Sequence, residues 1–193
     1  MAQLYAIVSN LARAQWLLEA QVPYVQLRFK AQPLAPHAEQ LREWVAQYPA
    51  SRLVINDDLD LALTVGAWGV HLGQDDLTRY EGNTLRQAPL SLGISTHTPQ
   101  EIAHALTFAP AIIGFGPVFA TASKSLTYPP QGLQRLQQVV AQVPVPVVAI
   151  GGIGPHNMRQ VVASGAGLLA MLSHLDTLTT VSQLQQLMDR LKP

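Results

Sequence analysis

Eight short apolar runs, several rich in β-branched residues, alternate with segments of helical periodicity along the chain. The runs begin near Leu4, Tyr24, Leu53, Gly69, Leu92, Ile112, Val147 and Leu168. Helical spacing of apolar residues is found over residues 11–20, 37–47, 61–65, 99–108, 133–143, 156–164 and 181–191, whereas Gly82 and Asn83 interrupt any long helix within 77–89. This alternation predicts repeated βα units around a parallel sheet.

Eight βα units allow two architectures, an open doubly wound sheet or a closed barrel. A doubly wound nucleotide-binding fold would carry a glycine fingerprint after its first strand, but residues 4–8 run into Ser9 and Asn10 without a glycine. Polar clusters follow many different strands, as in a barrel active site built from successive βα loops. We therefore expect a compact α/β (βα)8 TIM barrel, with residues 1–193 forming a single domain.

Composition restricts the class of protein further. The 193 residues are 48% hydrophobic, with a formal net charge of zero and no stripe of basic residues, so neither nucleic acid nor an anionic membrane surface is an expected partner. The absence of cysteine excludes disulfides and thiolate metal sites. No apolar run reaches membrane-spanning length, and we expect a cytoplasmic protein. A homo-oligomer is compatible with this composition.

Paired acidic residues follow two neighbouring strands. Asp57 comes directly after the apolar run 53–55, and Asp76 lies just past the run 70–72. Loops from adjacent strands would bring both carboxylates to one rim of the barrel, where oxygen ligands completed by water and substrate phosphate suit Mg²⁺.

The same acids allow a second interpretation as helix caps. Asp57, Asp58 and Asp60 precede the helix expected over residues 61–65, and Asp75 or Asp76 precedes the next one. Asp58 and Asp60 suit this structural role, and for Asp57 and Asp76 both interpretations stay open.

A cationic segment follows the second strand. Strand alternation places Gln26, Arg28 and Lys30 on one face and Leu27 and Phe29 on the other. Positive charge on an inward face is unfavourable unless an anion compensates it. The anion would be a bound substrate or, alternatively, the carboxylate of Asp57 in an internal salt bridge.

Two later regions offer further anion-binding groups. Lys124 ends the glycine-bearing stretch 114–124, which would either close over a phosphate or form an ordinary exposed loop. Gly151 and Gly152 follow the seventh strand, and Ser173 follows the eighth. Backbone amides at these positions form a phosphate site in many barrels.

Eight ordered segments carry a resemblance to a known family. They read QLRFK at 26–30, INDD at 55–58, HLGQDD at 71–76, LGISTHT at 92–98, GFGPVFATASK at 114–124, PQGL at 130–133, AIGGI at 149–153 and MLS at 171–173. With these motifs the chain resembles the thiamine phosphate synthase family over essentially its whole length.

The resemblance implies a (βα)8 barrel enzyme that joins 4-amino-2-methyl-5-hydroxymethylpyrimidine diphosphate to a thiazole phosphate and releases pyrophosphate. By this resemblance, the pyrimidine diphosphate would be held by Gln26, Leu27, Arg28, Phe29, Lys30, Asn56, Ser95 and Lys124. The thiazole phosphate would be held by Thr121, Ala122, Ser123, Gly152, Leu172 and Ser173, and Mg²⁺ by Asp57 and Asp76. Arg28, Lys30 and Lys124 would stabilise the departing pyrophosphate.

The chain departs from the family's usual pattern at Ser9, Ser123 and Ala170. Two rival functions are a thiazole tautomerase on the same barrel, with His97 as its base, and a non-catalytic regulatory protein that binds thiazole phosphate. The retained acids and cations favour the synthase. His97 is then expected at the rim of the site, and His71, inside a strand, as a core residue with its hydrogen bonds satisfied.

Overall fold

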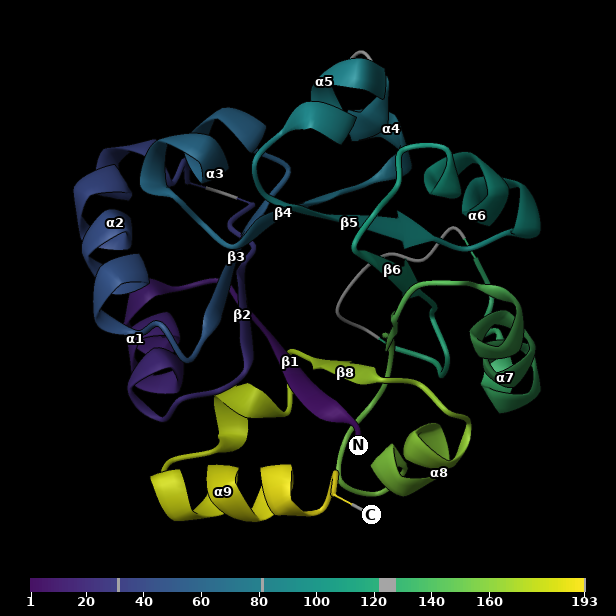
Figure 1. Ribbon diagram of the computed structural model, residues 1–193. Coiled ribbons are helices and arrows are strands. Elements are labelled where there is room, and N and C mark those ends of the chain that lie inside the picture. Colours follow the sequence, from purple (N-terminus) through teal and green to yellow (C-terminus); the bar gives the residue numbers. More distant parts are fainter. Residues whose placement is uncertain (31, 81, 122–127, 193) are drawn as a thin grey trace.

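The described part of the chain forms a closed barrel of eight parallel strands, in which β1 pairs with both β2 and β8 (Figure 1). The computed structural model describes residues 1–30, 32–80, 82–121 and 128–192. The strands are β1 (Gln3–Val8), β2 (Tyr24–Leu27), β3 (Arg52–Asn56), β4 (Gly69–Leu72), β5 (Ser91–Thr96), β6 (Ile112–Phe115), β7 (Val147–Ala149) and β8 (Leu168–Met171). The expected barrel is confirmed.

Helices surround this barrel on its outside (Figure 1). They are α1 (Leu11–Glu19), α2 (Ala38–Gln47), α3 (Leu59–Val65), α4 (Gln74–Leu77), α5 (Gly82–Gln87), α6 (Pro99–Leu106), α7 (Gly132–Gln142), α8 (Met158–Ala163) and α9 (Val181–Asp189), with short 3-10 helices η1 (Ala35–His37) and η2 (Leu175–Thr177). The ambiguous segment 77–89 contains the end of α4 and all of α5. No helix in the described ranges is both long enough and apolar enough to cross a membrane.

The ends of the helices follow local hydrogen-bonding chemistry. The Asp58 carboxylate accepts a hydrogen bond of 2.9 Å from the N–H of Leu61, so Asp58 is the N-cap of α3, as predicted. Thr98 caps α6 in the same way, and Pro99 occupies a position where its missing N–H is harmless. The helix expected from residue 156 begins only at Met158, because Asn157 accepts a hydrogen bond from the N–H of Gly154 and closes a turn there.

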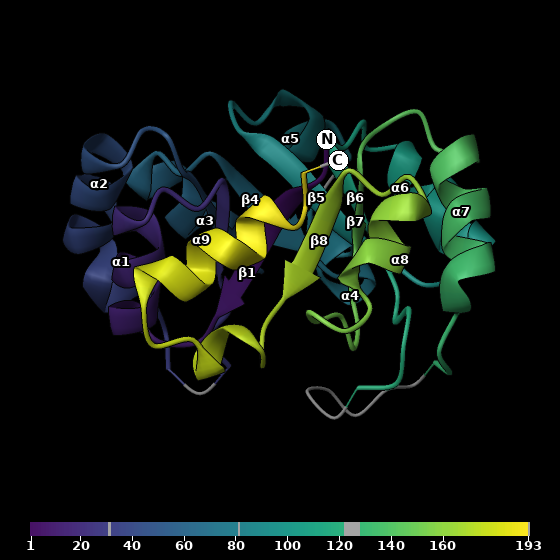
Figure 2. The ribbon, with the colours of Figure 1, turned by 90° about the horizontal axis from the view of Figure 1, so that it is seen from below.

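Two groups of buried side chains fill the molecule. The larger one lies between the outer faces of the strands and the helices and includes Leu4, Val25 and Ile55. The smaller one includes Tyr5 and residues at the starts of their strands, such as Tyr24, and the rings of Tyr5 and Tyr24 stack with centroids 5.5 Å apart. Because this second group closes the amino-terminal half of the barrel, the interior is accessible from the carboxyl ends of the strands. The arrowheads of β1 and β8 point to that end (Figure 2).

Candidate active site

A cavity of about 350 Å³ opens at the carboxyl ends of the strands. Every strand contributes to its wall, with Tyr5, Gln26, Asn56, His71, Ser95, Gly114, Val148 and Ala170 as one example from each strand in order. This end of the barrel is where the active sites of such folds lie, and the volume suits a small organic ligand.

The structure brings many of the predicted substrate-binding residues together around this cavity. Those that line it are Gln26, Arg28, Asn56, Ser95, Thr121, Gly152, Leu172 and Ser173. Leu27 and Phe29 pack instead in the larger core behind the strand, and Lys30 is exposed and does not line the cavity. The predictions for Ala122, Ser123 and Lys124 lie outside the described residues.

The cationic segment alternates as expected up to Phe29. Gln26 is buried, and its amide lies 3.3 Å from the hydroxyl of Tyr5 inside the barrel. The strand ends at Leu27, and Arg28 continues its direction through a 2.8 Å hydrogen bond from its N–H to the carbonyl of Val8. Beyond this point strand geometry no longer fixes the chain, which explains why Lys30 does not share the inward face.

Arg28 forms no ion pair with a carboxylate in the part of the chain that the structure describes. The alternative of an internal salt bridge to Asp57 is therefore not realised. The guanidinium contributes a positive charge to the cavity wall without a direct anionic partner, which is the situation that an anionic ligand would relieve.

Asp57 lies at the rim, immediately after β3, in a left-handed backbone conformation with φ of 64°. A 2.9 Å hydrogen bond from its N–H to the carbonyl of His71 holds this turn. Partial burial and, next, the neighbouring carboxylate of Asp76 raise the pKa of Asp57 to about 6, while Arg28 opposes the rise. The two predicted acids are thus close enough to repel each other, as expected from adjacent strands.

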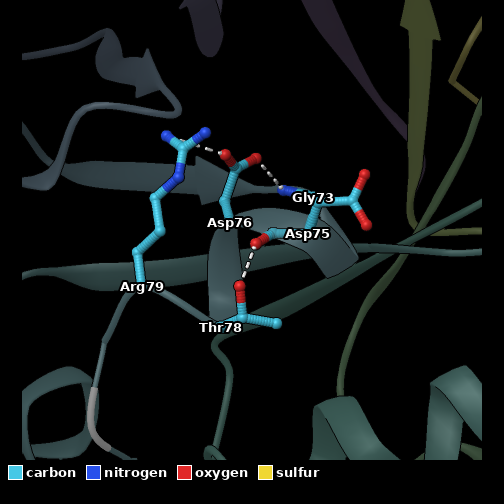
Figure 3. Close-up of polar contacts among 5 residues, drawn as sticks. All are labelled: Gly73, Asp75, Asp76, Thr78 and Arg79. Carbon is cyan, nitrogen blue, oxygen red and sulfur yellow. Dashed lines mark hydrogen bonds and ion pairs between the residues drawn. The ribbon is translucent and has the colours of Figure 1, made fainter.

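The carboxylate of Asp76 is held from two sides. One oxygen accepts a 3.0 Å hydrogen bond from the N–H of Gly73, and the other lies 3.3 Å from the guanidinium of Arg79. Figure 3 shows this arrangement, with the carboxylate of Asp75 pointing to the side away from Arg79. Asp76 therefore stabilises the start of α4 through the N–H of Gly73 and also lies beside Asp57. The interpretations of Asp76 as a helix cap and as a metal ligand are compatible.

These two acids suit Mg²⁺ better than a metal whose ligands must all come from the protein. The described residues contain no cluster of three or more histidine, aspartate or glutamate side chains able to hold a metal. Mg²⁺ commonly takes one or two carboxylates and completes its octahedral shell with water and substrate phosphates. Burial and, next, the carboxylate of Asp76 raise the pKa of Asp57, so the two acids are neighbours, which fits that donor set.

His71 differs from the satisfied core residue that the sequence suggested. Its side chain lines the cavity, and its Nε2 lies 2.9 Å from the Ser95 hydroxyl. Its Nδ1 is buried and has no hydrogen-bond partner among the residues that the structure describes. Burial, and secondarily the charge of Arg28, lowers the pKa of His71 to about 4, so the ring is neutral near pH 7. A histidine within an apolar run gives no indication in the sequence that its side chain faces a cavity.

His97 is half-buried in the cavity wall. Its Nδ1 lies 2.6 Å from the carbonyl of Gly116, and its ring stacks on Tyr128 with centroids 4.5 Å apart. Glu101 accepts hydrogen bonds from the N–H of His97 at 2.5 Å and from the Tyr128 hydroxyl at 2.8 Å. Because a carbonyl can only accept, Nδ1 carries the proton, and a neutral ring then has its lone pair on Nε2.

The glycine loop after β7 contains a buried residue that the sequence analysis missed. Asn157 donates a 2.8 Å hydrogen bond to the carbonyl of Gly152 and accepts one of 2.9 Å from the N–H of Gly154. Gly151 and Gly152 have positive φ values of 101° and 62°, and within the described ranges their N–H groups donate no hydrogen bond. These amides are therefore available to an anion at the cavity wall.

Comparisons with known proteins agree with this geometry. A family model described as thiamine monophosphate synthase matches residues 4–175. A thiamine-phosphate synthase of Photorhabdus laumondii is 40% identical over 174 residues, which cover 88% of this chain and 80% of that protein. One of Caldicellulosiruptor saccharolyticus is 34% identical over 188 residues, covering 95% of this chain and 85% of that protein.

A solved structure gives the same assignment. The thiamine phosphate pyrophosphorylase from Pyrococcus furiosus superposes with a TM-score of 0.80 at 25% sequence identity, covering 99% of this chain and 97% of that one. Because the family model spans nearly the whole barrel and the relatives have this degree of identity, the chain belongs to the thiamine monophosphate synthase family, a family of transferases.

Proposed function

We propose that this barrel condenses 4-amino-2-methyl-5-hydroxymethylpyrimidine diphosphate with a thiazole phosphate, carboxylated or aromatised, to give thiamine phosphate and pyrophosphate. Family membership supports the overall reaction. The observation that carries the proposal is the cavity itself, whose wall contains the glycine loop and Arg28, an arginine without an ion pair in the described ranges. Asp57 directly follows the lining residue Asn56 and lies near Asp76, so the carboxylate pair adjoins this wall.

The pyrimidine diphosphate would bind on the side of β2, β3 and β5. Gln26, Asn56 and Ser95 offer donors and acceptors for the ring, and Arg28 offers a charge-assisted contact to the diphosphate. Lys30 and Lys124 would add further positive charge for the diphosphate. Asp57 and Asp76 would hold Mg²⁺, which when bound would neutralise charge on the diphosphate oxygens.

The thiazole phosphate would bind on the opposite side, along β7 and β8. Its phosphate would be held by the backbone amides of Gly151 and Gly152 and by Ser173, with Thr121 and Leu172 nearby in the wall. Ala122 and Ser123 belong to the same proposed subsite. The two substrates would then face each other across the barrel.

The chemistry needs no nucleophilic side chain. The bond between the pyrimidine methylene and the diphosphate oxygen breaks, and the electron pair leaves with pyrophosphate. The electron-rich pyrimidine shares the positive charge left on the methylene carbon, and the lone pair of the thiazole nitrogen forms the new carbon–nitrogen bond. Arg28 stabilises the charge that builds on the leaving group, and the apolar side chains of Ile7 and Val148 help to exclude water.

Pyrophosphate release tests the proposal directly. Mixing the protein with both substrates and Mg²⁺ should release pyrophosphate in step with thiamine phosphate, and chelation of the metal should stop it. Omission of the thiazole phosphate is the control for simple hydrolysis. A wild-type protein that binds thiazole phosphate but yields neither product would instead support the non-catalytic alternative.

A substitution at His97 separates the synthase from a tautomerase. The attacking thiazole nitrogen already has a lone pair, so His97→Asn should leave coupling within roughly tenfold of wild type, against the roughly two to four orders of magnitude lost with a general base. The measurement is turnover with the aromatic thiazole phosphate. Abolished isomerisation of the carboxylated thiazole, in a protein whose wild type releases no pyrophosphate, would identify a tautomerase.

A further inference from the structure

Two histidines line the cavity on the side of β7 and β8. His156 follows the glycine loop after β7, and His174 lies between β8 and η2. A Cβ at residue 154 would lie 3.4 Å from both Cε1 and Nδ1 of His156, so this ring packs against the loop that carries Gly151 and Gly152. Neither histidine belongs to the segments that carry the family resemblance, and neither has a role in the proposed chemistry.

A third cationic side chain reaches the same loop. Arg190, which follows α9, donates a 2.7 Å hydrogen bond from Nη2 to the carbonyl of Pro155, the residue before His156. Its guanidinium forms no ion pair with a carboxylate in the described ranges, and the neighbouring Asp189 pairs with Lys192 at 2.6 Å. Arg190 therefore places a permanent positive charge beside the loop after β7.

These three basic groups influence one another. Partial burial, and next the charges of His156 and Arg190, hold the pKa of His174 below its ordinary value. No carboxylate in the described ranges contributes to this shift, and the side chains of Asp176 and Asp189 are exposed. The other titratable side chains that line the cavity also carry no negative charge near neutral pH, namely Tyr5, Arg28, His71 and His97. This side of the cavity therefore gains positive charge on protonation without an acidic side chain in the described ranges to offset it.

A cluster of this kind binds an anion and a proton together. In the free protein, a proton on His174 is repelled by the neighbouring basic groups, whereas an anion bound between them raises the pKa of His174. By linkage, affinity for the anion falls as the pH rises through that higher pKa. A phosphate monoester suits such a site, because it carries two charges above its second pKa of about 6 and accepts charge-assisted hydrogen bonds from imidazolium.

We propose that His156 and His174, with the charge of Arg190 beside them, form a proton-linked anion site that takes up a proton when it binds a phosphate monoester. This inference rests on the proposed function, which places the phosphate of the thiazole substrate at the adjacent glycine loop. The imidazoles donate hydrogen bonds to the phosphate in addition to those from the backbone amides, and Arg190 is a positioning residue that holds the carbonyl of Pro155. Binding of thiazole phosphate should therefore weaken as the pH rises above neutrality.

Calorimetry without the pyrimidine diphosphate measures this linkage. The aromatic thiazole phosphate is titrated into the protein between about pH 7 and about pH 8.5, where its phosphate stays dianionic, in buffers that differ in ionisation enthalpy. We expect net uptake of about one proton at most, and a dissociation constant that rises several-fold and at most roughly tenfold per pH unit. The thiazole alcohol is the control ligand and should show no proton uptake. A dissociation constant of the phosphate that is independent of pH, without proton uptake, overturns the inference.

Glutamine variants locate the proton. Glutamine keeps a polar side chain but cannot take up a proton, so the double variant His156→Gln/His174→Gln should bind thiazole phosphate roughly tenfold more weakly near neutral pH and without pH dependence. His37→Gln is the matched control, because His37 lies on η1 and does not line the cavity, and it should behave like wild type. Proton uptake that persists in the double variant assigns the proton to another group, such as His97, and contradicts the proposed site.

NMR titration of the histidines gives a second readout, which a merely structural role of Arg190 would not move. The His174 signal is assigned by its loss in His174→Gln. Saturating thiazole phosphate should raise the midpoint of the His174 titration, and so should Arg190→Met, because a repelling charge is removed. Arg190→Lys keeps the charge and should keep the midpoint low. A midpoint that neither the ligand nor Arg190→Met changes speaks against the site.

The inference and the proposed function fail separately. Formation of thiamine phosphate by a wild type whose affinity for thiazole phosphate is independent of pH contradicts only the inference. Proton-linked binding of thiazole phosphate by a wild type that releases no pyrophosphate with both substrates and Mg²⁺ contradicts only the proposed function.

Discussion

Arg28→Ala should lower turnover by roughly two to three orders of magnitude, the size of effect found when a single preorganised donor to a developing anion is removed. The guanidinium lines the cavity and has no ion pair with a carboxylate in the described ranges, so its charge is available to the departing pyrophosphate. Steady-state turnover at saturating concentrations of both substrates is the measurement.

Two controls accompany this variant. Arg28→Lys keeps the charge but loses the planar fork, and it should recover part of the rate. Lys192→Ala removes an exposed cation that pairs with Asp189 at 2.6 Å, and it should leave turnover unchanged. An Arg28→Ala enzyme with normal turnover and only weaker pyrimidine diphosphate binding would assign Arg28 to binding and remove it from the chemical step.

Loss of either carboxylate of the rim pair should lower activity by more than roughly tenfold while the barrel stays folded. Asp57→Asn is the sharper variant at the first position, because asparagine tolerates the left-handed backbone found there and changes only the charge. Asp76→Ala tests the second position. Turnover is measured as a function of Mg²⁺ concentration, and both variants should require more metal.

Asp58→Ala is the matched control for these acids. Asp58 follows Asp57 directly but caps α3 through the N–H of Leu61, so its loss should reduce the free energy of unfolding by about 1 kcal/mol without changing turnover at saturating metal. Normal turnover of Asp57→Asn and Asp76→Ala at limiting Mg²⁺ would exclude the pair from the active site.

Much of the fold could be predicted because it depends on periodicity and local capping. The apolar runs predicted the eight strands, Asp58 was expected to cap the helix that follows it and does so, and the helix expected from residue 99 begins there as α6. The start of α8 was misplaced because Asn157 binds the backbone of the preceding turn, and a side chain folded back in this way leaves no periodic signal.

The site could be predicted only where residues follow strand ends. Asp57 and Asp76 were placed together because adjacent parallel strands end at one rim, and Gln26 and Arg28 because strand alternation holds over that short distance. Lys30 lies beyond the strand, where alternation no longer applies. The contact between His71 and Ser95 depends on the register of β4, β5 and β6 and on Gly93 and Gly114, whose lack of a side chain leaves room for the imidazole. The sequence alone does not show the register that brings these residues together.

The pairing of β1 with β8 also constrains how this protein is made. Gln3 lies opposite Leu168, so one edge of the first strand has no partner until the eighth strand has been synthesised. A ribosome delivers the chain from its amino terminus, and throughout that time the growing sheet has open parallel edges able to pair with other chains. The barrel can close only after β8 (Leu168–Met171) has emerged, so the exposed edges of the sheet persist until late in synthesis.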